Sequence, residues 1–254
     1  MTRSFDGWAD CAFEAVSRDS AFDTVFPEVH PGRIELSHRV EVDSPYRDFS
    51  LALMHGAVVG FPDAALLLVG PGGTGKSTTN FAAVDQGALT CGDDYVWLSG
   101  SSGSLVAHSI YGTAKAKKAS SVIPPESMIA KRWRDSPTLD KRAYYVSLDR
   151  PDTFMRSARI VGAASLEISQ TRGTVIRASE SRDLLRKALP STVLQAPTHQ
   201  GQLLGRLTHL LAPIPSFHVT LSPNLQESGQ AILELLDSLS GRDSVAKRVT
   251  KASR

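Results

Sequence analysis

Residues 64–77 read AALLLVGPGGTGKS, which is a short apolar run followed by a glycine-rich loop. The run Ala64–Val69 has no polar position, as expected of a strand that is buried on both faces. The loop Gly70–Ser77 matches the pattern G-x-x-x-x-G-K-S/T in full, and a helical stretch over Lys76–Gln86 follows it. This order of strand, loop and helix predicts an α/β fold built around a P-loop.

The loop composition suits a triphosphate. Glycines let backbone N–H groups approach phosphate oxygens without a Cβ clash, and the following helix N-terminus favours an anion. We expect Lys76 to reach the β- and γ-phosphates and the Ser77 hydroxyl to ligate Mg²⁺. The alternative is a structural glycine turn, which would not require the strand and helix around it. The predicted nucleotide-binding residues of the loop are Gly70, Gly72, Gly73, Thr74, Gly75, Lys76, Ser77 and Thr78.

An acidic pair, Asp93-Asp94, begins 17 residues after Lys76. One helix, a turn at Gly87 and one short strand fit this spacing, and they would return the pair to the phosphate loop. One carboxylate could then face Mg²⁺ while the other faces an incoming hydroxyl group. Gly92-Asp93-Asp94 is also good turn chemistry, so a polar turn is the alternative.

Two other residues have two interpretations each. Asp149 ends YYVSL, which looks like a Walker B strand and makes Asp149 a second candidate for the metal. It could equally be a strand-ending aspartate before Arg150-Pro151. His55 has apolar neighbours in LALMHGAVV, as a core histidine would, but its strand is expected to pair into the P-loop sheet. Its side chain could therefore reach the acidic pair.

Residues 113–141 are basic and irregular, and we expect a mobile loop there. Phosphoryl transfer needs positive charge beyond Lys76 and one Mg²⁺. Lys115 is the first candidate to supply it and to bind the nucleotide, with Lys141 and Arg142 next. The other basic candidates in this stretch are Lys117, Lys118, Lys131, Arg132 and Arg134. Such a basic stretch could also be a solvated loop, or could hold an acidic or carboxylate-bearing peptide.

The remaining patterns predict alternating strands and helices. Strands are expected at 33–42, 49–59, 88–91, 95–98, 105–110, 144–148 and 217–221, with a hairpin turn at 100–103. Helices are expected from 179 onward, at 200–211 and at 226–239. We expect residues 1–240 to form one domain on which 1–30 pack, and 241–254 to be a disordered basic tail.

Composition argues against several classes of protein. The chain has 254 residues with 28 basic and 26 acidic side chains, which gives no case for nucleic-acid binding. No apolar run approaches the roughly 20 residues of a membrane-spanning helix, and the acidic, aromatic N-terminus is unlike a signal peptide. Cys11 and Cys91 lie far apart without a metal-binding pattern, so we expect reduced thiols in a cytoplasmic protein.

The order of His55-Gly56, the P-loop, its helix and CGDDYVWL resembles the catalytic domain of HPr kinase/phosphorylase over about residues 45–100. This resemblance implies an α/β fold of the P-loop HPr kinase/PEP carboxykinase type, a mixed sheet flanked by helices. It implies ATP and Mg²⁺ as cofactors and a homo-oligomer. It also implies that Asp93 is the catalytic base, that His55 is its electrostatic partner, and that Asp94 and Ser77 lie at the metal.

Two further segments, YGTAK at 111–115 and LPSTVLQAP at 189–197, look like short HPr-kinase-like proteins of bacterial natural-product clusters. Those proteins include kinases that phosphorylate the C-terminal serine of lasso-peptide precursors. We expect no counterpart of the large N-terminal domain or of the Glu-Ile-Arg-Gly segment of HPr kinases. The prediction is an ATP-dependent kinase of a serine-type hydroxyl on a peptide or protein. The alternatives are a kinase of a free metabolite or amino acid, and a nucleotide-dependent switch or ATPase without an acceptor.

Overall fold

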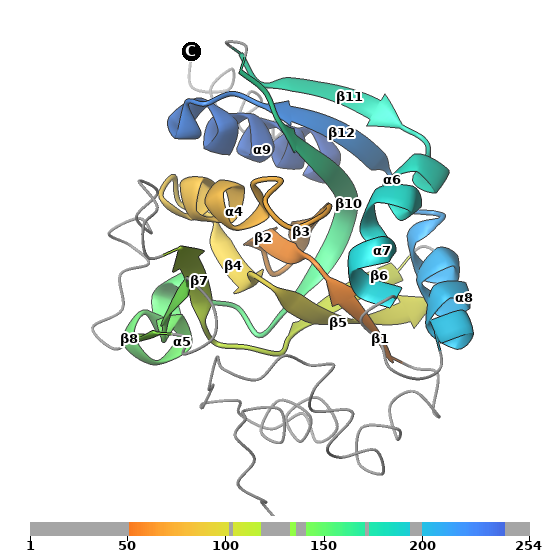
Figure 1. The fold of residues 1–254 in the computed structure, drawn as a ribbon, viewed down its shortest axis with the longest axis horizontal. Coiled ribbons are helices and arrows are strands. Elements are labelled where there is room, and N and C mark those ends of the chain that lie inside the picture. Colours follow the sequence, from red (N-terminus) through yellow and green to blue (C-terminus); the bar gives the residue numbers. More distant parts are fainter. Residues whose placement is uncertain are drawn as a thin grey trace, which may run out of the picture.

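The computed structural model describes residues 51–101, 104–117, 133–135, 141–170, 173–193 and 200–241 (Figure 1). The predictions for residues 1–42, for the hairpin tip at 102–103 and for the tail beyond Gly241 fall outside these residues.

The centre of the molecule is a nine-stranded mixed sheet. Its strands are β1 (Leu51–His55), β2 (Ala57–Phe61), β3 (Ala64–Val69), β4 (Leu89–Gly92), β5 (Tyr95–Ser101), β6 (Ser104–Ser109), β10 (Ser157–Ile168), β11 (Val175–Ser179) and β12 (Ser216–Leu221). They run in the order β1-β5-β6-β10-β3-β2-β4, and β12 pairs with both β10 and β11. A second sheet has the order β7-β9-β8, with β7 (Ala114–Lys117), β8 (Trp133–Asp135) and β9 (Lys141–Tyr144).

Helices cover both faces of the large sheet (Figure 1). One face carries α4 (Lys76–Val84) and α9 (Leu225–Ser240), and the other carries α6 (Ser181–Ala188), α7 (Pro190–Val193) and α8 (Gln200–Leu211). This mixed sheet flanked by helices confirms the predicted fold class. Among the described residues, no helix is long and apolar enough to cross a bilayer.

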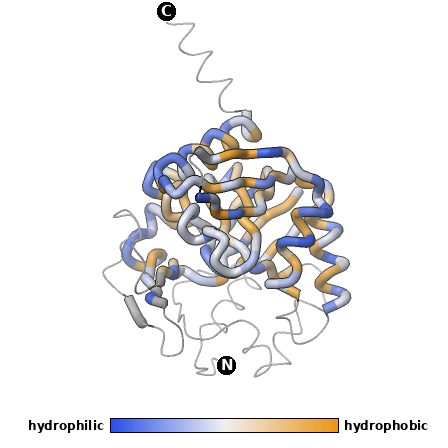
Figure 2. The backbone as a smooth tube through the Cα atoms, turned by 45° about the horizontal axis from the view of Figure 1, so that its top comes forward, coloured by the Kyte–Doolittle hydropathy of each residue, from blue (hydrophilic) through white to orange (hydrophobic). Residues whose placement is uncertain are grey.

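Strand β3 shows why the run AALLLV has no polar position. Alternate side chains of a strand point to opposite faces. Ala64, Leu66 and Leu68 therefore pack in the hydrophobic cluster under α4 and α9, and the three residues between them pack in the cluster under α6, α7 and α8. Hydrophobic residues accordingly concentrate in the central strands (Figure 2). Burial on both faces fixes β3, and with it the start of the P-loop.

The longest strand, β10, is not predicted by the sequence patterns, and neither is β11. Residues Ser157–Ile160 of β10 pair antiparallel with β6, and Ala163–Ile168 pair parallel with β12. The other side of β10 pairs parallel with β3. The middle of β10, Gly162–Leu166, is buried throughout, and burial on both faces removes the alternation that would mark a half-buried strand. Because β3 and β10 are parallel, β10 ends with Ile168 at the same edge of the sheet at which β3 ends with Val69.

The single strand predicted over 49–59 is wrong, because β1 and β2 are separate strands that meet at Gly56. A Cβ at Gly56 would lie only 2.9 Å from the Leu68 carbonyl oxygen, so the chain passes closer than a larger residue allows. After this point the pairing changes: β1 pairs with β5, whereas β2 pairs with β3 and β4. His55 consequently stands at the end of a strand.

The strand predicted over 144–148 is also wrong. Strand β9 ends at Tyr144, opposite Ala114 of β7, and α5 (Val146–Asp149) follows. Beyond the first residue of β7 the ladder stops. The Ser147 N–H still donates to the Gly112 carbonyl at 2.9 Å, but the Arg150 N–H donates within the helix to the Val146 carbonyl at 2.7 Å. Asp149 therefore ends a short helix and not a Walker B strand. Strand β7 likewise replaces part of the loop expected over 113–141.

The other predicted elements agree with the structure to within a few residues. The helix expected over 200–211 is α8, and the segments at 88–91, 95–98, 105–110, 217–221 and 226–239 correspond to β4, β5, β6, β12 and α9. Helix α4 ends at Val84, two residues before the predicted end.

Gly229 brings α9 close to α4, the helix that follows the P-loop. A Cβ there would lie 2.6 Å from the Ala82 carbonyl oxygen. We expect Gly229→Ala to lower the free energy of unfolding by about 1–3 kcal/mol through overpacking, as measured by urea denaturation. Gly205→Ala is the matched control, because a Cβ at this helical glycine meets no atom within 4 Å. It should raise stability by up to about 1 kcal/mol. Equal effects of the two substitutions would contradict the close α4–α9 contact.

Candidate functional site

A pocket with a volume of about 290 Å³ opens where the P-loop leaves β3. It brings together most of the residues predicted from the sequence: His55, Gly72, Gly73, Gly75, Lys76, Ser77, Thr78, Asp93, Asp94 and Lys115. Gly70 and Thr74 do not line it. The site is therefore assembled from β1, the P-loop, the β4–β5 connection and β7.

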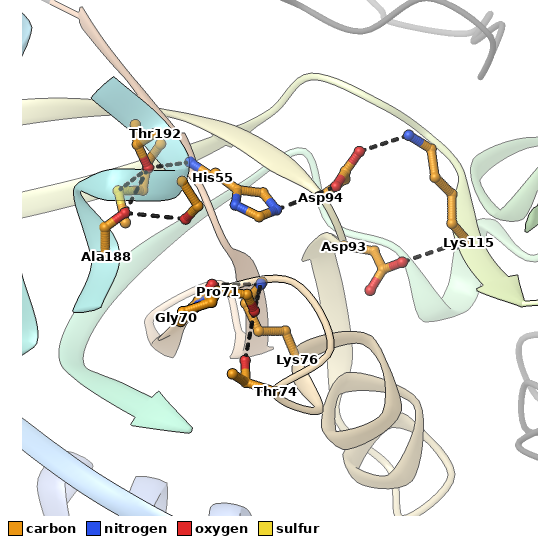
Figure 3. Close-up of polar contacts among 12 residues, drawn as sticks. His55, Gly70, Pro71, Thr74, Lys76, Asp93, Asp94, Lys115, Ala188 and Thr192 are labelled. Atoms are coloured by element: carbon orange, nitrogen blue, oxygen red, sulfur yellow. Dashed lines mark hydrogen bonds and ion pairs between the residues drawn. The ribbon is translucent and has the colours of Figure 1, made fainter. Parts of the chain in front are cut away.

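The P-loop is held in shape by its own polar groups (Figure 3). The Lys76 ammonium donates to the carbonyl oxygens of Gly70 and Pro71, at 2.7 and 3.0 Å. The Thr74 hydroxyl donates to the Pro71 carbonyl at 2.9 Å. Gly75 has φ 96°, and a Cβ there would lie 2.7 Å from Leu221, so this position requires glycine. Gly70 and Thr74 thus shape the loop, while Lys76 keeps a mostly buried charge at the pocket.

Asp93 is the buried member of the acidic pair. One of its oxygens, Oδ2, accepts a hydrogen bond from the Lys115 backbone N–H at 2.9 Å. The Ser77 hydroxyl lines the same pocket and lowers the pKa of this carboxyl. The other oxygen, Oδ1, is buried and has no hydrogen-bond partner among the described residues. Burial raises the pKa of Asp93 to about 6, against the opposing effect of the Lys115 N–H.

Asp94 is the more accessible member, with 19% of its side chain exposed. Its Oδ2 lies 2.6 Å from the Lys115 ammonium, and its Oδ1 lies 3.6 Å from His55 Nε2 (Figure 3). Burial raises the pKa of Asp94, but the charge of Lys115 and the contact with His55 outweigh it and hold this pKa well below its usual value. Asp94 is therefore an ionised carboxylate between two basic groups.

His55 contacts Asp94, not Asp93 as the resemblance implied. The β1–β5 register places His55 opposite Tyr95, and the two rings lie 4.9 Å apart. The neighbouring Gly56 N–H donates to the Asp94 carbonyl oxygen. On the other side, the backbone N–H of His55 donates to the Thr192 hydroxyl of α7 at 3.1 Å. This pairing follows from strand register, which residue spacing does not encode.

The donors around Ser77 and Asp93 fit a magnesium ion. Mg²⁺ prefers oxygen ligands and is usually held by one or two carboxylates together with phosphate oxygens of the substrate. Ser77 offers a hydroxyl beside the Asp93 carboxylate, and the unpartnered Asp93 Oδ1 is an acceptor that a cation or its water would satisfy.

Two of the remaining candidates, whose side chains the structure describes, lie outside the pocket. Asp149 and Arg142 do not line it. Lys117 and Lys141 are paired in the backbone register of β7 and β9, and Arg134 lies in β8. Lys118, Lys131 and Arg132 lie outside the described residues. The structure adds Phe81, Ala116 and Ile168 to the pocket lining. Ile168 is the last residue of β10. The apolar residues of this strand are the only feature of the sequence that could have pointed to it.

The buried charge of Asp93 has a consequence for stability. Because its folded-state pKa of about 6 exceeds the usual 3.8, its ionisation opposes folding, and stability is lost as pH rises through this interval. We expect Asp93→Asn to raise the free energy of unfolding of the metal-free, nucleotide-free protein by roughly 1–3 kcal/mol at pH 8. Urea denaturation at pH 8 and pH 4 measures this, and the difference between variant and wild type should nearly vanish at the lower pH. A variant that is less stable at pH 8 would show that Asp93 does not carry a buried charge.

No protein-family model matches the sequence, and no curated protein matches it either. Among solved structures, the chain is similar to the HPr(Ser) kinase/phosphatase from Coxiella burnetii. The two sequences are 13% identical, the match covers 79% of this chain and 95% of that chain, and the TM-score is 0.37. Because so distant a similarity defines neither activity nor substrate, both must be inferred from the site.

Proposed function

We propose that this protein is an ATP-dependent kinase that transfers the γ-phosphoryl group to a serine-type hydroxyl of a peptide or protein. One observation carries the proposal: two carboxylates with different environments stand together at the P-loop. Asp93 is buried beside Ser77, and Asp94 lies between His55 and Lys115. A nucleotide switch needs only one acidic group beside the metal, whereas phosphoryl transfer to a hydroxyl also uses a group that accepts its proton.

On the triphosphate side, Lys76 and the loop N–H groups bind the β- and γ-phosphates. The Lys76 ammonium, which now bonds two loop carbonyls, exchanges one or both of them for phosphate oxygens. Ser77 and Asp93 would hold Mg²⁺, which neutralises charge on the phosphates when bound. Asp93 is assigned to this side because it lies beside Ser77, is only 4% exposed and has a buried oxygen, Oδ1, that a cation would satisfy.

On the acceptor side, Asp94 is the base. It is the more exposed carboxylate of the pair and lines the pocket, so a hydroxyl can reach it. The acceptor oxygen bonds to the γ-phosphorus, the bond to the β,γ-bridging oxygen breaks, ADP leaves, and the hydroxyl proton passes to Asp94. When Lys115 moves its charge to the γ-phosphate, Asp94 loses a positive neighbour and becomes more basic, while His55 keeps it oriented. This assignment exchanges the roles that the family resemblance implied for the two aspartates.

The acceptor we favour is a ribosomal peptide precursor of the lasso type. Two segments that resemble lasso-peptide kinases both contact the site. YGTAK contributes Lys115, and LPSTVLQAP contributes Thr192, which holds the backbone of His55. The reaction would take place in the cytoplasm, where ATP and Mg²⁺ are supplied.

The test is incubation with γ-labelled ATP, Mg²⁺ and candidate acceptors, followed by mass spectrometry. Peptides that end in serine should gain a phosphoryl group, and ADP should form only when an acceptor is present. Phosphorylation of free serine but of no peptide would favour a metabolite kinase. Release of ADP at the same rate without an acceptor would indicate an ATPase, and binding without ADP formation would indicate a switch protein.

A further inference from the structure

Ile168 is an exposed apolar residue at the edge of the phosphate pocket. It is 52% exposed, the highest value among the large hydrophobic residues that the structure describes. It lines the pocket, and its Cγ1 lies 3.5 Å from the place of a Cβ on Gly75 of the P-loop. Removing apolar surface from water is favourable, and about half of this side chain is still exposed to water. A ligand with an apolar surface would therefore gain free energy by covering it.

The sheet places Ile168 and the acidic pair on opposite sides of the P-loop. Strand β10, which ends at Ile168, pairs with β3 on one side. Strand β2 pairs with β3 on the other side and connects it to β4, which leads into Asp93 and Asp94. The loop thus lies between an apolar flank and a flank of charged groups.

This polarity orients a bound nucleotide. The γ-phosphate belongs on the charged flank, next to Asp94 and Lys115, so the nucleoside must leave the loop toward the other flank. A volume of about 290 Å³ is at the lower end of the range for small-molecule pockets, roughly 300–1,000 Å³. The phosphates therefore occupy the pocket, and the nucleoside lies along its rim.

We propose that the side chain of Ile168 is the surface on which the nucleobase lies. This inference rests on the proposed function, because it requires the triphosphate to lie with its γ-phosphate at the acidic pair. A nucleobase has a flat face of low polarity, which suits an aliphatic side chain. A contact with the face of the base depends on the area of its ring and not on the hydrogen-bonding groups at its edge. Ile168 should therefore favour purine over pyrimidine nucleotides without separating ATP from GTP.

Isothermal titration calorimetry with two ligands tests the proposal: Mg²⁺–ATP, and Mg²⁺–tripolyphosphate, which has no base. Ile168→Ala should raise the Kd for ATP about tenfold, the effect of losing one buried aliphatic contact, and leave that for tripolyphosphate within about twofold. Ile168→Val, which keeps the apolar branched shape, should bind ATP nearly as the wild type does. Leu204→Ala is the matched control, since Leu204 is 41% exposed and lies on α8, outside the pocket. It should change neither Kd.

Two results would overturn the proposal. One is an unchanged Kd for ATP in Ile168→Ala. The other is an equal loss for ATP and tripolyphosphate, which would show that the substitution disturbs the P-loop instead. In the wild type, ATP and GTP should bind more tightly than CTP and UTP. Ile168→Ala should reduce this difference in Kd between purine and pyrimidine nucleotides. Because these are binding measurements, a failure of phosphoryl transfer would refute the kinase and leave the base contact standing.

Discussion

Asp94→Asn is expected to lower the rate of phosphoryl transfer by about 10²–10⁴-fold, the usual contribution of a general base. Asparagine has the shape of aspartate and can still accept a hydrogen bond from Lys115, but it cannot take a proton from the acceptor hydroxyl. The Kd for Mg²⁺–ATP should change only a few-fold, because Asp94 lies on the acceptor side of the pocket. Single-turnover assays with a phosphorylatable peptide give the rate, and calorimetry gives the Kd.

The neighbouring substitution distinguishes the two carboxylates. Asp93→Asn should weaken Mg²⁺-dependent ATP binding, because Asp93 lies beside Ser77 at the expected metal position. Asp152→Asn is the control, since Asp152 is an aspartate that lies outside the pocket, where it pairs with Arg150. If Asp93→Asn instead loses transfer with normal ATP binding, and Asp94→Asn loses Mg²⁺-dependent binding, the roles implied by the family resemblance hold.

The parts of this site that the sequence predicts are those set by local structure. The P-loop is eight consecutive residues whose backbone geometry demands glycine and whose ligand demands Lys76 and Ser77. The return of Asp93-Asp94 to the loop needs only a helix and a short strand of ordinary length. Neither step depends on which distant segments pair.

The parts that the sequence does not predict depend on pairing between distant segments. Contact between His55 and Asp94 requires the β1–β5 register and the change of strand at Gly56. Ile168 enters the site only because β10 inserts between β3 and β6, and no alternation marks the buried middle of β10, Gly162–Leu166. The segment before Asp149 shows the opposite case. Residues 144–148 have the composition of a strand, but the partner strand β7 does not extend past Ala114, and a short helix forms instead.

Lys76→Met is expected to cause the largest loss of nucleotide binding. Lys76 is only 7% exposed, and its ammonium is held at the pocket by two loop carbonyls. Methionine keeps most of the aliphatic stem, so the loop can stay packed while the charge is lost. Removing one partner of a buried charge pair costs about 2–5 kcal/mol, which corresponds to a rise in Kd of about 30- to 4,000-fold.

Calorimetry with Mg²⁺–ATP and Mg²⁺–tripolyphosphate makes this result specific. In the proposed complex Lys76 contacts phosphate and not the base. Lys76→Met should therefore raise the Kd of both ligands by the same factor, whereas Ile168→Ala should raise the Kd of ATP alone. Lys187→Met is the control, because Lys187 is a half-buried lysine that contacts His218 outside the pocket. Normal ATP binding by Lys76→Met would mean that the loop is not the phosphate cradle. The assignments of Asp94 and Ile168 would then fail with it, since both are oriented by a triphosphate in that loop.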